Sequence, residues 1–177
     1  MEPLSAVAVA LTAALALTGC SSSGPATDGP LGGGGAYGSI SGGSVCVPGR
    51  VGQPRTFGIE RFANHGHTTV VLDSVALLHP RNERLVGSYA VPGKFLIGIE
   101  DWPPKYAGIP STWKDRQAVH GFRLAPGKTF NMVLGVEAVA TSRANSQGMV
   151  IYYHDSEGRY VTSNDLAMIT AVDKPQC

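Results

Sequence analysis

The chain has 177 residues, and its 14 Lys and Arg against 13 Asp and Glu give a formal net charge of only +1. The charged residues are scattered along the chain rather than collected into a basic run or an acidic tail. This pattern excludes the charged segments through which many proteins bind nucleic acid.

The first 19 residues are predicted to be a signal peptide. Residues 6–17 are almost entirely apolar, but they are too few for a membrane-spanning helix, which needs about 20. The segment ends in Leu17-Thr18-Gly19-Cys20, which resembles the lipobox of bacterial lipoproteins. The resemblance implies cleavage before Cys20, attachment of lipid to that cysteine, and a position at the extracytoplasmic face of the cell membrane.

Residues 20–44 are predicted to be a lipid-anchored, flexible linker. Ser21 to Ser44 include nine Gly and six Ser, with few apolar side chains that burial could stabilise. A disordered coil of this length would place the following domain about 25–30 Å from the membrane. We therefore expect one folded domain, at 45–177.

Two cysteines remain after the lipobox, and they bracket this domain. Cys46 lies near its beginning and Cys177 is the last residue. Export would place both in an oxidising compartment, so the sequence favours a disulfide between them. Two free thiols are the alternative.

The first half of the domain is predicted to form short strands. Residues 56–62 and 68–78 flank a candidate hairpin turn at 63–67. The second run is apolar on both sides except at Asp73 and Ser74, which predicts a central strand covered on both faces, or a strand with one solvent-exposed residue at Asp73. Shorter strands are expected at 85–91, 95–99 and 119–124.

A long segment between residues 100 and 120 contains both tryptophans of the chain. Long loops in small domains are often functional, and Trp and Tyr are enriched at binding surfaces. One interpretation is a binding loop in which Trp102, Tyr106 and Trp113 contact a cell-envelope protein or glycan. The alternative is a structural lid over one end of the domain.

The second half of the domain shows the clearest alternation. Residues 129–139 place apolar side chains on one side, as expected for a strand that is half-buried on a core. Residues 150–153 and 159–162 predict a hairpin, and 166–172 predict a closing strand. Together these runs predict an all-β, immunoglobulin-like, two-sheet sandwich of about seven or eight strands after a disordered N-terminal tether.

The whole chain is similar to small lipoproteins of high-GC Gram-positive (actinobacterial) type that carry an uncharacterised immunoglobulin-like domain. The resemblance rests on the lipobox, the Gly/Ser spacer, Leu124-Ala125-Pro126-Gly127 before a strand, and the tyrosine-rich segment 152–160. It implies a membrane-tethered domain and names no activity.

Two functional classes remain. Motifs typical of enzymes are absent from the sequence, which favours a non-catalytic binding or structural role. The alternative is an exported copper- or zinc-binding protein that uses His65, His67 and His154, because imidazoles spaced by two residues can share a metal ion. Solvated turn histidines are the simpler interpretation of the same residues.

Overall fold

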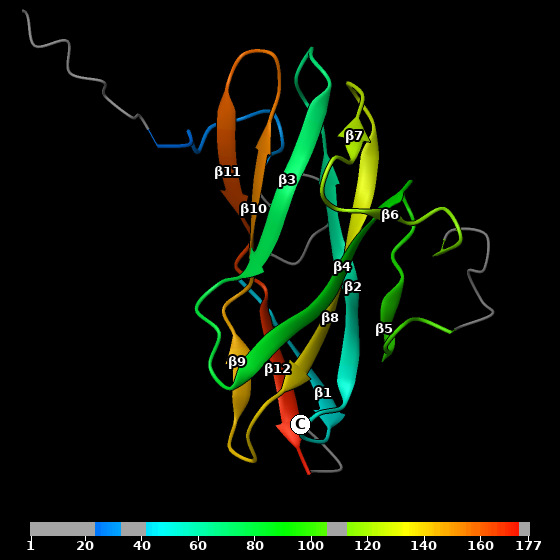
Figure 1. Ribbon diagram of the computed structural model, residues 1–177, viewed down its shortest axis with the longest axis vertical. Helices are drawn as coiled ribbons and strands as arrows, with labels where there is room; N and C mark the ends of the chain where they lie inside the picture. The colour runs from blue at the N-terminus through cyan, green and yellow to red at the C-terminus, as the bar shows by residue number, and fades with distance from the viewer. Residues whose placement is uncertain (1–23, 33–41, 106–112, 174–177) are drawn as a thin grey trace, which may run out of the picture.

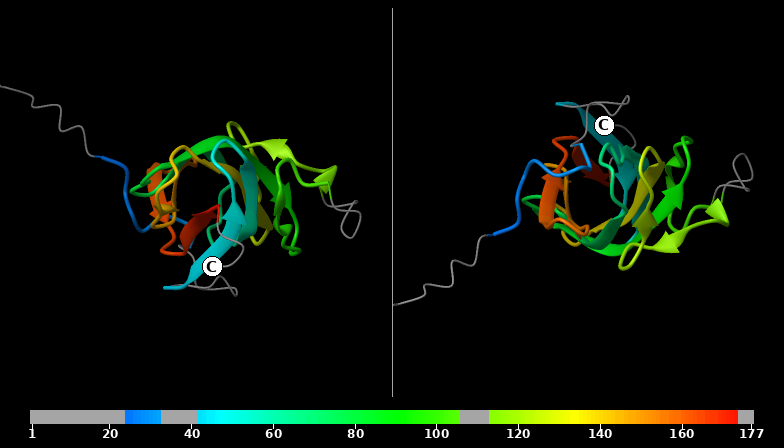
Figure 2. Two further views of the ribbon diagram at one scale, coloured as in Figure 1. Left: turned by 90° about the horizontal axis from the view of Figure 1, so that it is seen from below. Right: turned by 90° about the horizontal axis from the view of Figure 1, so that it is seen from above.

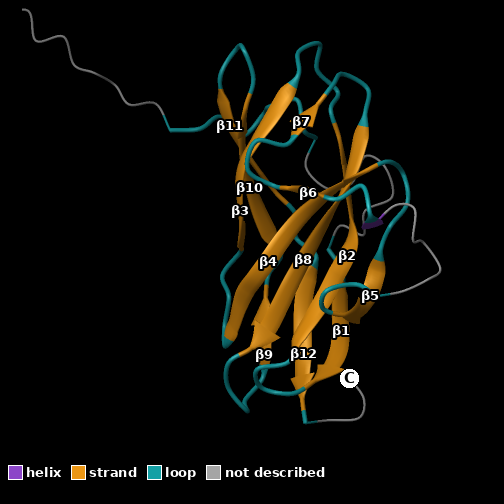
Figure 3. Cartoon of the chain, turned by 45° about the vertical axis from the view of Figure 1, so that its right-hand side comes forward, coloured by secondary structure: helices purple, strands orange, loops and turns teal. Residues whose placement is uncertain are grey.

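The computed structural model describes residues 24–32, 42–105 and 113–173, and strands dominate these ranges (Figures 1 and 3). The strands are β1 (Ser44–Gly49), β2 (Pro54–Ala63), β3 (Val70–Leu77), β4 (Glu83–Pro92), β5 (Gly98–Asp101), β6 (Gln117–Ala118), β7 (Arg123–Leu124), β8 (Thr129–Ala138), β9 (Ala144–Ser146), β10 (Met149–His154), β11 (Arg159–Ser163) and β12 (Ala167–Val172).

The strands form two layers around one core. One layer is a five-stranded antiparallel sheet in the order β5-β2-β8-β4-β6. The other layer contains a four-stranded sheet, β11-β10-β3-β7, and a three-stranded sheet, β1-β12-β9. Figure 2, viewed along the long axis, shows the orange and red strands of the second layer across the core from the first.

The two smaller sheets are joined because two chain segments run through both of them. β9 continues into β10, and β11 continues into β12, with a bend in each where the pairing changes. At the bend, the Asn164 side chain accepts a hydrogen bond of 2.7 Å from the Met149 N–H. Gly148 has a φ of 138° there, which favours glycine. The prediction of an all-β sandwich is confirmed, and the number of strands exceeds eight because these bends divide long strands and because β5, β6 and β7 are short.

The core lies between the layers. Phe62 of β2 and Phe130 of β8 stack with their ring centroids 5.5 Å apart. Leu72 of β3, Ile151 of β10 and Met168 of β12 face them from the second layer and are almost fully buried. Each such side chain contributes about 1.5–3 kcal/mol through its burial.

Two expectations about individual strands were wrong. Residues 63–67 are not a hairpin turn, because β2 pairs with β5 and β8 while β3 pairs with β7 and β10. The chain instead crosses between layers here, held by buried Asn64, whose side-chain amide donates to the carbonyls of Thr68 and Leu124 at 2.8 and 2.9 Å.

β8 is more buried than the sequence predicts, and β3 is less buried. β8 was expected to be half-buried, but every residue after Thr129 is buried, because its outer face is also covered. β3 was expected to be covered on both faces or to expose only Asp73, but the exposed residues are Ser74 and Ala76. A run of apolar residues therefore does not by itself place a strand at the centre of this domain.

Part of the expected flexible linker is packed on the domain. Ala26 forms a parallel bridge with Tyr160, and Leu31 forms an antiparallel bridge with Asn64. The Leu31 side chain is 1% exposed, and its N–H donates to the Tyr153 hydroxyl at 3.2 Å. Residues 24–32 thus correct the predicted linker boundary, because one large apolar side chain among the glycines fills a place in the core.

Several predictions fall outside the described residues. These are the signal peptide, Cys20 and Cys177, so the pairing of Cys46 on β1 with Cys177 stays a prediction. Within the described ranges, no helix has the length and apolarity needed to cross a membrane.

Candidate functional site

The tryptophans of the predicted binding loop lie against the five-stranded sheet. Gly87 of β4 and Gly135 of β8 are paired neighbours, and the Trp102 indole lies directly over both. A Cβ atom would be 2.6 Å from the indole at Gly87 and 2.4 Å from it at Gly135. The two glycines therefore form the flat patch on which Trp102 rests, so Trp102 covers the outer face of β8 at Gly135.

Trp102 belongs to a small aromatic cluster. Its ring stacks on Tyr89 at 5.9 Å, and the Trp113 ring meets Tyr89 edge-on at 5.4 Å. The Arg116 guanidinium lies 4.8 Å from the Trp113 ring centroid, a cation–π geometry. Both tryptophans are half-buried, as a structural cover would be, and Tyr106 lies outside the described residues.

The three histidines of the metal hypothesis do not form a metal site. His154 contacts Asp73, whereas His65 lies in the crossing between β2 and β3, where its N–H donates to the Pro30 carbonyl at 2.9 Å. In the part of the chain that the structure describes, no group of three His, Cys, Asp or Glu residues is arranged to hold an ion. His67 is therefore not part of a group of three metal-ligating side chains among the described residues.

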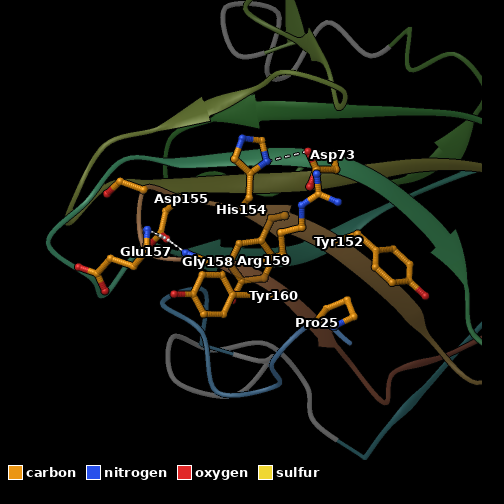
Figure 4. Close-up of a pocket in the computed structure, with 11 residues that line it drawn as sticks. Pro25, Asp73, Tyr152, His154, Asp155, Glu157, Gly158, Arg159 and Tyr160 are labelled. Carbon is orange, nitrogen blue, oxygen red and sulfur yellow. Dashed lines mark hydrogen bonds and ion pairs between the residues drawn. The ribbon is translucent and has the colours of Figure 1, made fainter. Parts of the chain in front are cut away.

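A β-bulge places Asp73 beside His154. In the pairing of β3 with β10, Ser74 lies opposite Tyr152 and Leu72 lies opposite Tyr153, so Asp73 is the extra residue. Such an irregularity can direct a side chain away from the regular alternation of a strand. The Asp73 carboxylate lies 2.8 Å from His154 Nδ1 and is 39% exposed (Figure 4).

A pocket of about 640 Å³ surrounds this pair at the β10–β11 hairpin (Figure 4). Arg159 of β11 lies directly opposite His154 on the neighbouring strand, so both side chains belong to the outer face. Tyr152, which is 41% exposed, adds an aromatic ring on the same face. The complete lining is Pro25, Asp73, Tyr152, Tyr153, His154, Asp155, Ser156, Glu157, Gly158, Arg159 and Tyr160.

The hairpin turn that closes the pocket is ordered by Asp155. Its carboxylate accepts hydrogen bonds from the Glu157 and Gly158 N–H groups at 2.7 and 3.0 Å, and from the Thr68 hydroxyl at 2.7 Å. Desolvation raises the pKa of Asp155, but these hydrogen bonds outweigh it, so the pKa lies below its usual value. The turn therefore keeps a fixed negative charge at the pocket rim.

The inner side of the hairpin is rigid as well. The Tyr153 and Tyr160 rings stack with centroids 5.4 Å apart, and Gly29 packs against the Tyr153 hydroxyl and the Tyr160 ring. Burial raises the pKa of Tyr153 to about 12, and its hydroxyl accepts a hydrogen bond from the Leu31 N–H. Residues 24–32, which the sequence predicts to be a flexible linker, thus support one wall of the pocket. Pro25 of this segment lines the pocket.

Sequence reasoning found His154 and the hairpin but missed the rest of this site. In the sequence, Asp73 interrupts an apolar strand, and Arg159 and Tyr152 lie within predicted strands. The polar residue Asp73 inside an otherwise apolar strand is the feature of the sequence that could have indicated this site. The bulge that makes Asp73 a neighbour of His154 depends on strand pairing, which the sequence does not specify.

The fold and the site together define an all-β sandwich with a polar, tyrosine-lined pocket on the outer face of one sheet. No protein-family model matches the chain, and no curated protein is similar to it in sequence. A solved structure of the Vibrio cholerae VesB protease is similar over 72% of this chain, with 9% sequence identity and a TM-score of 0.37. The chain covers 30% of that protease chain, and a similarity this distant does not bear on activity.

Proposed function

We propose that the chain is a membrane-tethered, extracytoplasmic lipoprotein whose β-sandwich has a non-catalytic binding role. The lipobox-like Leu17-Thr18-Gly19-Cys20 supports the anchor. The pocket at the β10–β11 hairpin is the single observation that carries the binding role, because it combines volume, an exposed aromatic ring and ordered hydrogen-bonding groups.

The chemistry of the pocket favours a glycan of the cell envelope as the ligand. Tyr152 offers a ring face on which a sugar can stack, and His154, Asp73 and Arg159 offer donors and acceptors for hydroxyl groups. The His154–Asp73 contact fixes the imidazole, so a ligand meets hydrogen-bonding groups that are already oriented.

The anchor predicts that Cys20→Ala releases the protein from the membrane. Metabolic labelling with an alkyne-bearing fatty acid should mark the wild-type protein in the membrane fraction, and Cys20→Ala should lose both label and membrane association. Cys46→Ala is the matched control and should keep the label. An unmodified, uncleaved wild-type protein in the cytosol would contradict the anchor.

The pocket predicts that Tyr152→Ala weakens binding to insoluble peptidoglycan from a high-GC Gram-positive bacterium. We expect an affinity loss of about ten-fold in a sedimentation assay, since an aromatic contact contributes about 1.5 kcal/mol. Phe95→Ala removes another exposed ring, 67% exposed, away from the pocket and should bind like the wild type. Equal binding by both variants, or no binding by the wild type, would refute a glycan ligand.

A further inference from the structure

A second pocket, of about 550 Å³, lies where β4 ends and β8 begins. Its two sides are tied together by hydrogen bonds from the Gly93 N–H to the Thr129 carbonyl, at 2.9 Å, and from the Thr129 hydroxyl to the Gly93 carbonyl, at 3.0 Å. β7 supplies a third side through Arg123 and Leu124. The pocket is therefore built on strand ends that the sheet holds in place.

All the charges that line this pocket are positive. Lys94, Arg123 and Lys128 line it, and no Asp or Glu does. Within residues 24–32, 42–105 and 113–173, none of the ion pairs includes these three side chains, and all three are exposed. Three unneutralised cations around one cavity favour a ligand with negative charge.

Exposed apolar side chains adjoin the basic pocket. Phe95 and Leu96 directly follow Lys94 in the loop between β4 and β5 and are 67% and 39% exposed. Paired basic and apolar groups of this kind suit the boundary of a membrane, where the cations meet headgroups and the apolar side chains enter the acyl region.

The pocket is also close to the point where the N-terminal segment docks. The Asn64 carbonyl accepts from the Gly127 N–H at 2.9 Å, and the Asn64 N–H donates to the Lys128 carbonyl at 3.0 Å. On its other side, Asn64 forms the bridge with Leu31. One residue of the crossing therefore separates the docked segment from the basic pocket.

This placement matters if Cys20 carries lipid, and to that extent the inference rests on the proposed function. Cys20 precedes the described residue Gly24 by four positions, and an extended chain spans at most about 3.6 Å per residue. The start of the docked segment is then within about 15 Å of the lipidated residue. A flexible linker of 25 residues would instead place the domain about 25–30 Å from the membrane.

We propose that Lys94, Arg123 and Lys128 bind the phosphate of an anionic lipid headgroup in the membrane that holds the anchor. Phe95 and Leu96 enter the interface beside it. The acyl anchor and the basic pocket would then act as two membrane signals at one end of the domain, and together they fix its orientation.

The test uses the mature chain from Cys20 onward with Cys20→Ser, so that no acyl chain contributes. Co-sedimentation compares vesicles of phosphatidylglycerol with vesicles of phosphatidylcholine. We expect binding to the anionic vesicles that weakens as salt is added. Each lost charge should lower the partition coefficient about five-fold, the factor that corresponds to about 1 kcal/mol per basic residue, so that the triple variant Lys94→Gln, Arg123→Gln, Lys128→Gln loses on the order of 100-fold.

A matched control removes three positive charges at the opposite end of the sandwich. The control carries Arg50→Gln, Arg81→Gln and Arg143→Gln. These arginines lie near the far end of β8, where Val51 forms a β-bridge with Ala138 and Arg81 forms one with Asn145. This control should bind like the parent chain, and unchanged thermal unfolding of both variants should show that each is folded. Phe95→Ser should weaken vesicle binding without changing the preference for anionic lipid.

Equal binding to both kinds of vesicle, or equal loss in the two triple variants, would overturn the proposal. Binding of glycerol 1-phosphate without vesicle binding would also overturn it and would indicate a soluble phosphoester ligand. Failure of the anchor has a different signature, because fatty-acid labelling would then be absent while the non-acylated chain still bound anionic vesicles.

Discussion

Leu31→Ala should destabilise the domain by about 3 kcal/mol, although Leu31 belongs to a glycine-rich segment that the sequence predicts to be unstructured. The side chain is 1% exposed and is part of the main core cluster. Removing a buried leucine side chain costs about 2–5 kcal/mol, because burial is lost and a cavity remains. For a domain of this size the midpoint of thermal unfolding should fall by roughly 10 °C.

Leu96→Ala is the matched control for this measurement. It makes the same chemical change at a leucine that is 39% exposed, so the midpoint should hardly move. Differential scanning calorimetry of both variants at one pH gives the comparison. If Leu31→Ala unfolds at the same temperature as the wild type, residues 24–32 do not belong to the core. They would then be part of the flexible linker, as the sequence predicts.

Gly29 shows why the prediction of a flexible linker was wrong for residues 24–32. A Cβ atom there would lie 2.3 Å from the Tyr153 hydroxyl and 2.6 Å from the Tyr160 ring, so glycine is what allows the chain to pack so closely. Gly and Ser lower the expected order of a segment through chain entropy, but the same small size permits close backbone approach. Composition alone does not separate these two roles.

The parts of the fold that the sequence did predict depend on local patterns. Alternation and turn residues located β2, β3, β4, β8, β10, β11 and β12 within a few residues of their observed bounds. The pairing of those strands depends on contacts between distant residues, and the candidate site is an example. Asp73 reaches His154 only through a bulge between β3 and β10, and Trp102 finds a flat surface because Gly87 and Gly135 become neighbours.

The domain should also lose stability as the pH rises from 5 to 8. Glu60 and Glu83 are 1% and 6% exposed. Burial raises the pKa of each to about 7, from 4.5, and for Glu83 a hydrogen bond from the Thr170 hydroxyl offsets only part of that effect. For Glu60, the Asn164 side chain offsets only part of the effect of burial, and neither carboxylate oxygen makes a hydrogen bond of regular geometry with the described residues.

The direction follows from proton binding in the two states. The folded protein holds these protons more tightly than the unfolded chain, so the stabilisation is complete below pH 4.5 and is lost as the pH rises through about 7. With about 1.4 kcal/mol for each unit between 4.5 and about 7, each group accounts for about 3.5 kcal/mol at most. The pKa of Asp155 is lowered, which has the opposite sign, but that carboxyl is already ionised at pH 5 in both states.

Glu60→Gln and Glu83→Gln separate this effect from other titrations. Glutamine keeps the shape of a protonated glutamate and does not ionise, so the double variant should show nearly the same unfolding midpoint at pH 5 and pH 8. The wild type should lose roughly 10 °C or more over the same interval, given that about 1 kcal/mol moves the midpoint by several degrees. Glu157→Gln, at an exposed glutamate of the hairpin turn, should keep the wild-type dependence on pH. If the wild type is equally stable at both pH values, burial does not raise the pKa of Glu60 and Glu83 in the folded protein, and the prediction is wrong.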